Sequence, residues 1–298
     1  MPTPIIARLA RSTPFLAGAL LAAVALASPA RAEEWTKSFT VSGHPQVQVK
    51  TNDGAVDVRT GDTKQVDFRV EYHGYELNKN LRIDTRQDGN TVAIEARLTN
   101  HFSVVGHWCL FCVDSHRNLR IIVNMPKDAD LNVDTGDGGV ESQAVNGAVD
   151  IHTGDGHINI SGAKGDIRLR TGDGHIEAHD LDGKVEATSG DGRVRMDGRF
   201  DVLYIKTGDG SIDTRVNPGS KMASAWTIRT SDGSVDLVLP DGFAADVDAQ
   251  TRDGRISLGF PLTVQGGLSN SQIHGKLNGG GAPLTIHTGD GSIHLRRA

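Results

Sequence analysis

The chain has 298 residues, of which 36 are Gly and only 5% are aromatic. A helical bundle or an α/β enzyme needs larger core residues than this composition supplies, whereas a narrow β-structure has room for Val, Ile and Ala. The formal net charge is −6 and no basic patch dominates the sequence, so nucleic acid is not an expected partner.

Residues 1–32 have the pattern of a secretory signal peptide. Arg8 and Arg11 precede a short apolar stretch, residues 15–27, and Ala30-Arg31-Ala32 forms a small-x-small cleavage site. We expect the mature protein to begin at Glu33 and to be exported to the periplasm, the cell surface or the medium. No transmembrane segment is expected after cleavage, because the apolar stretch is too short to span a bilayer comfortably. An uncleaved membrane anchor is the alternative.

Residues 33–298 are expected to form a single β-solenoid domain. Short runs of alternating apolar residues between 35 and 71 predict its first coils, with a turn at Thr51-Asn52-Asp53-Gly54. Residues 72–118 interrupt this pattern and are interpreted as an insertion within the domain. Within the insertion, residues 81–98 predict a β-hairpin around Asp88-Gly89-Asn90.

Cys109 and Cys112 are the only cysteines, and they lie in the insertion. A disulfide is the favoured interpretation, because disulfides persist in exported proteins. A zinc site could use these residues together with His107 and His116, although four ligands within so short a segment would be cramped. A thioredoxin-like redox pair would need a helix start and a βαβ setting, and neither is visible. A pair of free thiols is the remaining alternative.

The centre of the chain repeats one four-residue turn. Thr135-Gly136-Asp137-Gly138 recurs 18 residues apart at Thr153, Thr171, Ser189 (as Ser-Gly-Asp-Gly) and Thr207. This period is too short for helical repeats and predicts a β-solenoid. Further glycines at 147, 165 and 183 lie midway between the turns, so each 18-residue coil should consist of two short strands and two corners. By analogy with most crossover connections, we expect the coil to be right-handed.

Alternation within each coil predicts which residues face the core. The second residue after each Asp-Gly is β-branched and apolar, and the next residue but one is more variable. The first set should form one buried column: Val140, Ile158, Ile176, Val194 and Ile212. Polar residues between the two sets, such as Glu177, Arg195 and Asp213, should face water.

After Thr207 the period becomes less regular. The turn returns at Thr230, Thr251 and Thr288, and the first two intervals contain a few extra residues that should be corner loops. The longer last interval predicts one degenerate coil around 269–273.

With these motifs, the sequence resembles a bacterial putative-adhesin family of unknown function, made of β-strand repeats and related to autotransporter-adhesin heads. The resemblance rests on the strand 119–123, on Pro126-Lys127-Asp128-Ala129-Asp130-Leu131 and on the Thr-Gly-Asp-Gly turns, and it covers roughly residues 39–295. It also includes Leu277-Asn278-Gly279-Gly280-Gly281 before the final turn. The resemblance implies an exported single-stranded β-helix and no established activity.

Stacked coils would place the turn aspartates in one column, which is the weak candidate for a metal site: Asp137, Asp155, Asp173, Asp191 and Asp209. Calcium favours several oxygen ligands. The alternative is turn chemistry, in which Gly takes a positive φ and Asp accepts neighbouring backbone N–H groups. We favour turn chemistry and expect no cofactor, with calcium or zinc as open possibilities.

A second column contains His157, His175 and Arg193, one period apart. It could form a pH-sensitive or anion-attracting stripe on the surface. The simpler interpretation is that these are exposed corner residues.

The expected function is a non-catalytic adhesin or structural module of the cell envelope, with an envelope glycan or another envelope protein as its partner. A carbohydrate-active enzyme on a β-helix scaffold is one alternative, and a cation-binding module is another. An enzyme is not favoured, because the carboxylates recur with the repeat, whereas a catalytic pair flanks a single cleft.

Overall fold

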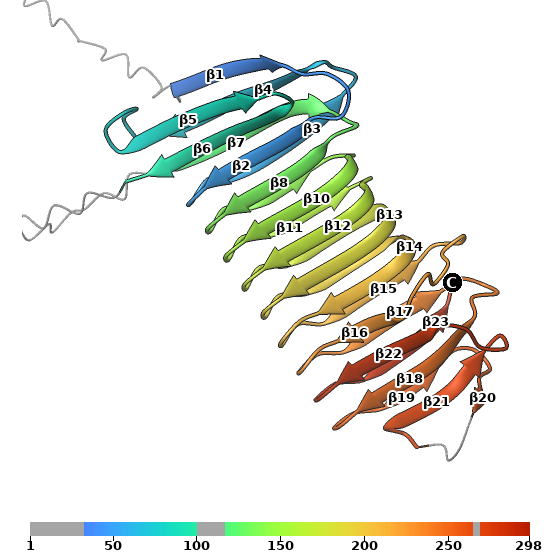
Figure 1. Cartoon of the computed structure of the whole chain (residues 1–298). Helices are drawn as coiled ribbons and strands as arrows, with labels where there is room; N and C mark the ends of the chain where they lie inside the picture. The colour runs from blue at the N-terminus through green and yellow to red at the C-terminus, as the bar shows by residue number, and fades with distance from the viewer. Residues whose placement is uncertain (1–32, 100–116, 265–268) are drawn as a thin grey trace, which may run out of the picture. The chain divides into compact units, whose positions relative to one another are not determined.

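The computed structural model describes residues 33–99, 117–264 and 269–298, which consist of strands, turns and loops without a helix (Figure 1). Hydrogen bonds join the 23 strands of these residues into one continuous sheet. The expected all-β class is therefore confirmed. Most strands belong to two parallel ladders, which we call ladder A and ladder B, and the chain passes from one to the other at each turn.

Ladder A holds the strand that precedes each turn. In spatial order its members are β6 (Thr91–Leu98), β2 (Gln46–Thr51), β8 (Asp130–Thr135), β10 (Asn146–Thr153), β12 (Lys164–Thr171), the second halves of β13 (Ile176–Ser189) and β14 (Val194–Lys206), β16 (Trp226–Arg229), β22 (Pro283–Thr288) and β18 (Ala245–Thr251).

Ladder B holds the strand that follows each turn. Its members are β7 (Asn118–Pro126), β3 (Ala55–Gly61), β9 (Val140–Ser142), β11 (Ile158–Ser161), the first halves of β13 and β14, β15 (Ile212–Val216), β17 (Val235–Leu239), β23 (Ile293–Arg297) and β19 (Ile256–Leu258).

The register in the centre of both ladders follows the repeat. Thr153 of β10 pairs with Thr171 of β12 on one side and with Thr135 of β8 on the other, so each partner lies 18 residues away in the chain. In ladder B, Ile158 pairs with both Val140 and Ile176. The expected column is confirmed, because its members are fully buried: Val140, Ile158, Ile176, Val194 and Ile212. Alternation with period two thus builds a thin core between the ladders.

A threonine hydroxyl holds each turn to its neighbour. The buried Thr153 Oγ1 lies 3.1 Å from the carbonyl oxygen of Gly136 and 3.0 Å from that of Gly138, in the adjacent turn. The same hydroxyl accepts the N–H of Gly156 in its own turn at 3.1 Å. Equivalent hydroxyl contacts occur at Thr171, Ser189, Thr207 and Thr230. Buried polar groups of the turn are therefore satisfied by Thr.

The turn glycines have a different role from the expected one. Gly156 and Gly174 do not have positive φ values. Instead, a Cβ atom at Gly174 would overlap the carbonyl oxygen of Gly156 in the neighbouring turn. Close approach of two backbones, rather than left-handed geometry, requires Gly there. Positive φ is found at the opposite corner, for example at Gly165 with φ +125°.

The strand pairs at the two ends do not stack in chain order, contrary to the expectation. The pair β2–β3 lies between β6–β7 and β8–β9. Likewise, β22–β23 lies between β16–β17 and β18–β19 (Figure 1). Because β2–β3 and β22–β23 each lie between two other strand pairs, both of their edges are hydrogen-bonded. A strand pair at the end of the stack would expose one edge.

Antiparallel strands cover three of the four ladder ends. The predicted hairpin is confirmed: β5 (Leu81–Asp88) pairs with β6, and it covers one end of ladder A. In ladder B, β4 (Gln65–His73) covers β7, and β1 (Glu33–Thr40) covers β4. The expected coils at 35–71 and 269–273 are therefore partly wrong. At the second site, β21 (Gln272–Leu277) runs antiparallel to β18 and pairs with β20 (Thr263–Val264), because a ladder end needs a cover rather than another coil.

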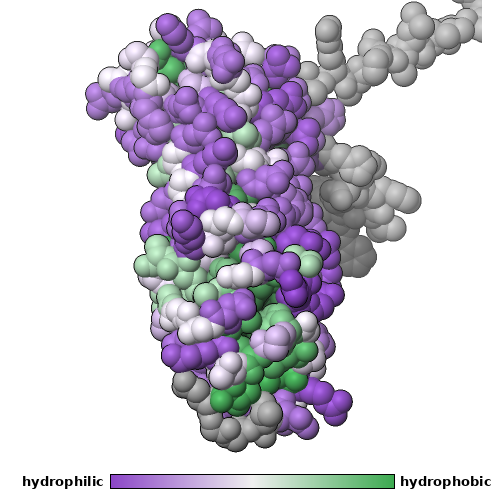
Figure 2. Space-filling model, turned by 90° about the vertical axis from the view of Figure 1, so that its right-hand side faces the viewer, coloured by the Kyte–Doolittle hydropathy of each residue, from purple (hydrophilic) through white to green (hydrophobic). Residues whose placement is uncertain are grey.

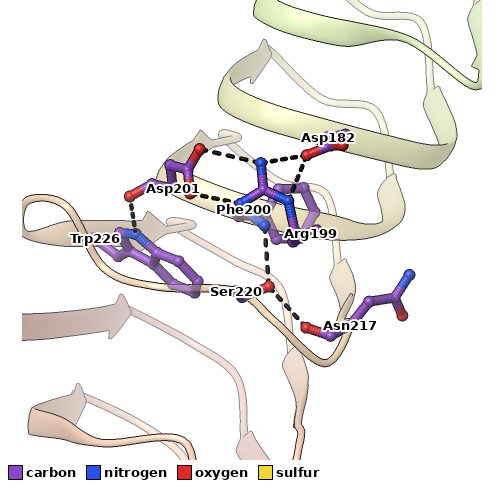
Figure 3. Close-up of polar contacts among 7 residues, drawn as sticks. All are labelled: Asp182, Arg199, Phe200, Asp201, Asn217, Ser220 and Trp226. Carbon is purple, nitrogen blue, oxygen red and sulfur yellow. Dashed lines mark hydrogen bonds and ion pairs between the residues drawn. The ribbon is translucent and has the colours of Figure 1, made fainter.

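The extra residues after β15 and β17 form corner loops, as expected. The loop between Val216 and Trp226 is fixed by contacts drawn in Figure 3: Ser220 Oγ accepts the N–H of Phe200 at 3.0 Å and donates to the carbonyl oxygen of Asn217 at 2.8 Å. The indole of the buried Trp226 donates to the carbonyl oxygen of Asp201 at 3.3 Å. These bonds bring β16 back into register after the loop.

Candidate functional site

The turn aspartates stand in one exposed column. Asp137, Asp155, Asp173, Asp191 and Asp209 are each exposed on successive turns. The first four of these carboxylates lie close to the glycine of the next turn; for example, a Cβ atom at Gly172 would lie 3.4 Å from Asp155 Oδ1. In the described residues these five carboxylates accept no backbone N–H group, so the expectation that they do is wrong. The Thr hydroxyls accept backbone N–H groups of the turns instead. The carboxylates are therefore left available to solvent.

Within residues 33–99, 117–264 and 269–298, no group of three or more His, Cys, Asp or Glu side chains could hold a metal ion. Calcium at the turn aspartates stays the weaker alternative that the sequence analysis left open. Cys109 and Cys112 lie outside the described residues, together with His107 and His116, and their pairing remains a prediction.

The rings of His157 and His175 stack on each other. Their centroids lie 5.4 Å apart and their planes differ by 10°. The first ring lies over Gly139, where a Cβ atom would collide with it. Arg193, on the next turn, donates to Ser211 Oγ at 2.9 Å and lies 3.9 Å from Asp213. The two imidazoles thus stack as a pair. Arg193 does not join them, because it contacts Ser211 and Asp213 instead.

The outer face of ladder B carries alternating charge. Glu177, Arg195 and Asp213 are neighbours in register, as expected, and the last two lie 3.9 Å apart. Beside them, His179 Nδ1 lies 2.6 Å from Asp197 Oδ1. Arg195, Asp213, His179 and Asp197 line a shallow hollow. Because opposite charges face each other across strands, most of the charge on this face is internally compensated.

The outer face of ladder A contains a second ion-pair network. Arg170 lies 2.7 Å from Asp150, and Arg168 lies 3.6 Å from Asp150 and 3.3 Å from Glu186. The hydrogen bond to Glu186 raises the pKa of Arg168. Both carboxylates on this part of the face are thereby neutralised.

The corner between the ladders holds a cluster that the sequence analysis missed. Arg199 lies between Asp182 and Asp201, and it donates to the two oxygens of Asp201 at 2.7 and 3.2 Å (Figure 3). Both hydrogen bonds raise the pKa of Arg199. No turn motif marks these residues. The only sign of this cluster in the sequence is that the repeat is interrupted after Val216. We interpret the cluster as a support for the corner loop that begins there.

Apolar residues also reach the surface. On the face drawn in Figure 2, hydrophobic residues gather toward the lower end, whereas the upper part is mostly hydrophilic. Two shallow hollows meet at the loop Pro240-Asp241-Gly242, and they are lined in part by Met222, Phe243, Phe260 and Leu277. Arg297 pairs with Asp241 at their junction.

A family model described as Toastrack DUF4097 matches residues 44–296 of the chain. This match confirms the resemblance to a family of β-strand-repeat proteins. No curated protein matches the chain. Among the described residues, no helix has the length and apolar character needed to cross a membrane.

Several solved structures are similar to the chain in fold. One is a putative cell adhesion protein from Clostridium sporogenes, at 14% identity and a TM-score of 0.34, covering 90% of this chain and 100% of that one. Another is a putative lipid binding protein from Parabacteroides distasonis, at 15% identity and a TM-score of 0.46, covering 88% and 96%. A third is a putative adhesin from Bacteroides fragilis, at 13% identity and a TM-score of 0.40, covering 88% and 97%.

Proposed function

The chain belongs to the Toastrack DUF4097 family, and on this premise we propose that it is a non-catalytic binding module of the cell envelope. Its partner is an extended molecule, either an envelope glycan or another envelope protein. The module is exported, loses residues 1–32 and acts in the periplasm, at the cell surface or in the medium. The proposal includes the expected solenoid with right-handed, 18-residue coils.

The register of the turns carries the proposal. Thr135, Thr153 and Thr171 are direct neighbours across the strands, and the exposed Asp of each turn follows two residues later. The same chemistry is therefore presented again at each strand spacing of about 4.8 Å. A repeated, exposed surface of this kind suits contact with an extended partner, which can engage several turns at once.

The rigidity of the turns supports the same proposal. Each turn is held to the next by a backbone bond, such as Gly172 N–H to the carbonyl oxygen of Gly154 at 2.5 Å, and by the buried Thr hydroxyl. A surface that is ordered before binding loses little conformational entropy when a partner docks. Modest contacts at each turn can then add up to useful affinity.

The test uses purified residues 33–298, immobilised and exposed to polysaccharide and protein fractions of the native envelope. The expected result is selective retention of one extended component, compared with beads that carry the same protein after heat unfolding. Absence of retention from every fraction, under conditions in which the protein is folded, would contradict the proposed function.

A further inference from the structure

We propose that the outer face of ladder A contains a binding site for an acidic polysaccharide whose charge is carried by uronic-acid carboxylates. The site is the basic patch, which consists of Tyr204, Lys206, Thr227, Arg229, Thr285 and His287. This inference rests on the proposed function and names the partner and the contact surface.

Strand register assembles the basic patch from three adjacent strands. Tyr204, Thr227 and Thr285 are neighbours in one row across β14, β16 and β22. Lys206, Arg229 and His287 are neighbours in the next row. Because alternate residues share a face, all six side chains point outward together. Residues that lie up to 83 positions apart in the chain thus form one grid of two rows and three columns.

The cations of the basic patch are free to meet a ligand. Lys206, Arg229 and His287 are exposed, and none of them forms an ion pair within the part of the chain that the structure describes. The flanking carboxylates in the first row are already engaged: Glu186 beside Tyr204 is paired with Arg168 at 3.3 Å, and Asp248 beside Thr285 is paired with His274 at 3.1 Å. Within the segments that carry the patch, residues 202–206 of β14 and the whole of β16 and β22, the outward side chains include no carboxylate.

Tyr204 gives the basic patch an apolar platform. It is the one large hydrophobic side chain counted as exposed among the described residues, with 38% of its surface accessible. An aromatic ring with a polar end can cover the C–H face of a sugar while its hydroxyl remains hydrated. Thr227 and Thr285 are half-buried beside it and add hydroxyl groups that can donate to or accept from sugar hydroxyls.

The row of cations fits regularly spaced carboxylates. Strand spacing places Lys206, Arg229 and His287 along a line of about 10 Å. An Arg guanidinium can hold a carboxylate with two parallel hydrogen bonds, and Lys adds a mobile charge. A linear polyuronate presents carboxylates along its length and a sugar ring face beside them, so it matches both rows of the grid.

A single-stranded nucleic acid is the less suitable polyanion. Proteins that bind it without sequence preference use several aromatic side chains for successive bases in a positively charged groove. The basic patch has one aromatic ring, and the exposed turn aspartates Asp209 and Asp232 border its cation row. These carboxylates repel any polyanion, so the single aromatic ring is what distinguishes the basic patch from a site for single-stranded nucleic acid.

The test measures binding of residues 33–298 to polygalacturonate at low and moderate salt. Wild type should bind, and the affinity should fall as salt rises, because the contacts are exposed ion pairs. Lys206→Ala/Arg229→Ala should weaken binding at least about 10-fold, while Arg229→Lys, which keeps the charge but loses the paired hydrogen bonds, should weaken it less than the double variant does. Tyr204→Ala should also weaken binding, whereas Tyr204→Phe should preserve it.

Arg215→Ala is the matched control, because Arg215 is an exposed cation on ladder B without an ion pair among the described residues. The inference is overturned if Arg215→Ala weakens binding as much as the patch variants. It is also overturned if the fully methyl-esterified polymer binds as well as polygalacturonate, or if single-stranded DNA binds more tightly. Should polygalacturonate fail while another envelope fraction is retained, this inference falls and the proposed function stands.

Discussion

The hydroxyl of Thr171 lies 2.9 Å from the carbonyl oxygen of Gly156, which belongs to the neighbouring turn, and it accepts the N–H of Gly174 in its own turn at 3.2 Å. One buried side chain therefore closes its own turn and joins it to the next. The Thr of the motif is in this sense the structural residue, and the Asp is the exposed one.

Replacing Thr171 by Val should lower the free energy of unfolding by about 1–3 kcal/mol, because the shape is kept while the Gly174 N–H loses its buried acceptor. Urea unfolding followed by circular dichroism measures this. Thr188→Val, at a half-buried outward position of the adjacent strand β13, is the control and should change stability by less than about 0.5 kcal/mol. Equal effects at both sites would show that the turn hydroxyl has no special role.

Replacing Gly174 by Ala should destabilise the protein by more than about 2 kcal/mol, since the new methyl group would overlap the carbonyl oxygen of Gly156. The thermal midpoint and soluble yield report the effect. Gly61→Ala is the comparison, because a Cβ atom at Gly61 meets open space and the φ of this residue is not positive. A tolerated Ala at 174 would mean that the turns stack less closely than the structure indicates.

Asp130 should make stability depend on pH. Its carboxylate lies 2.9 Å from His44 Nε2 and accepts the N–H of Ala148 at 2.8 Å. The hydrogen bond to His44 has the largest effect, and together with the bond from Ala148 it lowers the pKa of Asp130, although partial burial acts in the opposite direction. Because the pKa of Asp130 is lower in the folded state than in the unfolded state, where it is about 3.9, the carboxylate stabilises the protein at pH values above the unfolded-state pKa. This contribution is lost as the pH falls through the folded-state pKa.

The measurement compares the unfolding free energy of wild type and Asp130→Asn from neutral pH to about pH 2. The variant should be less stable at neutral pH, by at most about 1 kcal/mol because both side chains are partly exposed, and the difference should disappear at low pH. Asp62→Asn, at an exposed carboxylate without an ion pair among the described residues, should follow the wild-type profile. A constant difference at all pH values would refute the linkage.

Replacing Asp173 by Asn should have little effect on folding, within about 1 kcal/mol, because the carboxylate is exposed and accepts no backbone hydrogen bond among the described residues. Binding of an extended partner should also persist, since neighbouring turns carry the same side chain. The control is Asp155→Asn, one turn away, which should behave identically. Loss of all binding at only one of them would point to a single-site function.

Much of the fold could be predicted from the period of the sequence. Alternation around Ile176 identified its buried face, and the constant interval between Thr153 and Thr171 identified its partners. Asp88-Gly89-Asn90 identified the hairpin. These features are local, so each depends only on residues close in the chain or one period away.

The order of the terminal strand pairs could not be predicted in the same way. Similar turns at Thr230, Thr251 and Thr288 allow any of these pairs to stack on another, so the period alone does not identify neighbours. What distinguishes the observed order is long-range, such as Arg296 with Asp236 at 2.8 Å and Arg252 with Asp290 at 2.8 Å. The same limitation concealed the basic patch, because Lys206, Arg229 and His287 become neighbours only through that order.

The most direct test of the account is whether the protein changes a polysaccharide that it retains. Purified residues 33–298 are incubated with the retained envelope polymer and with polygalacturonate, and reducing ends, unsaturated sugars and polymer length are followed to long times. The account predicts that the bound polymer is recovered intact, at the rate of a protein-free control. Product that forms with wild type and disappears with one Asp substitution, by orders of magnitude as expected for a catalytic acid, would contradict it.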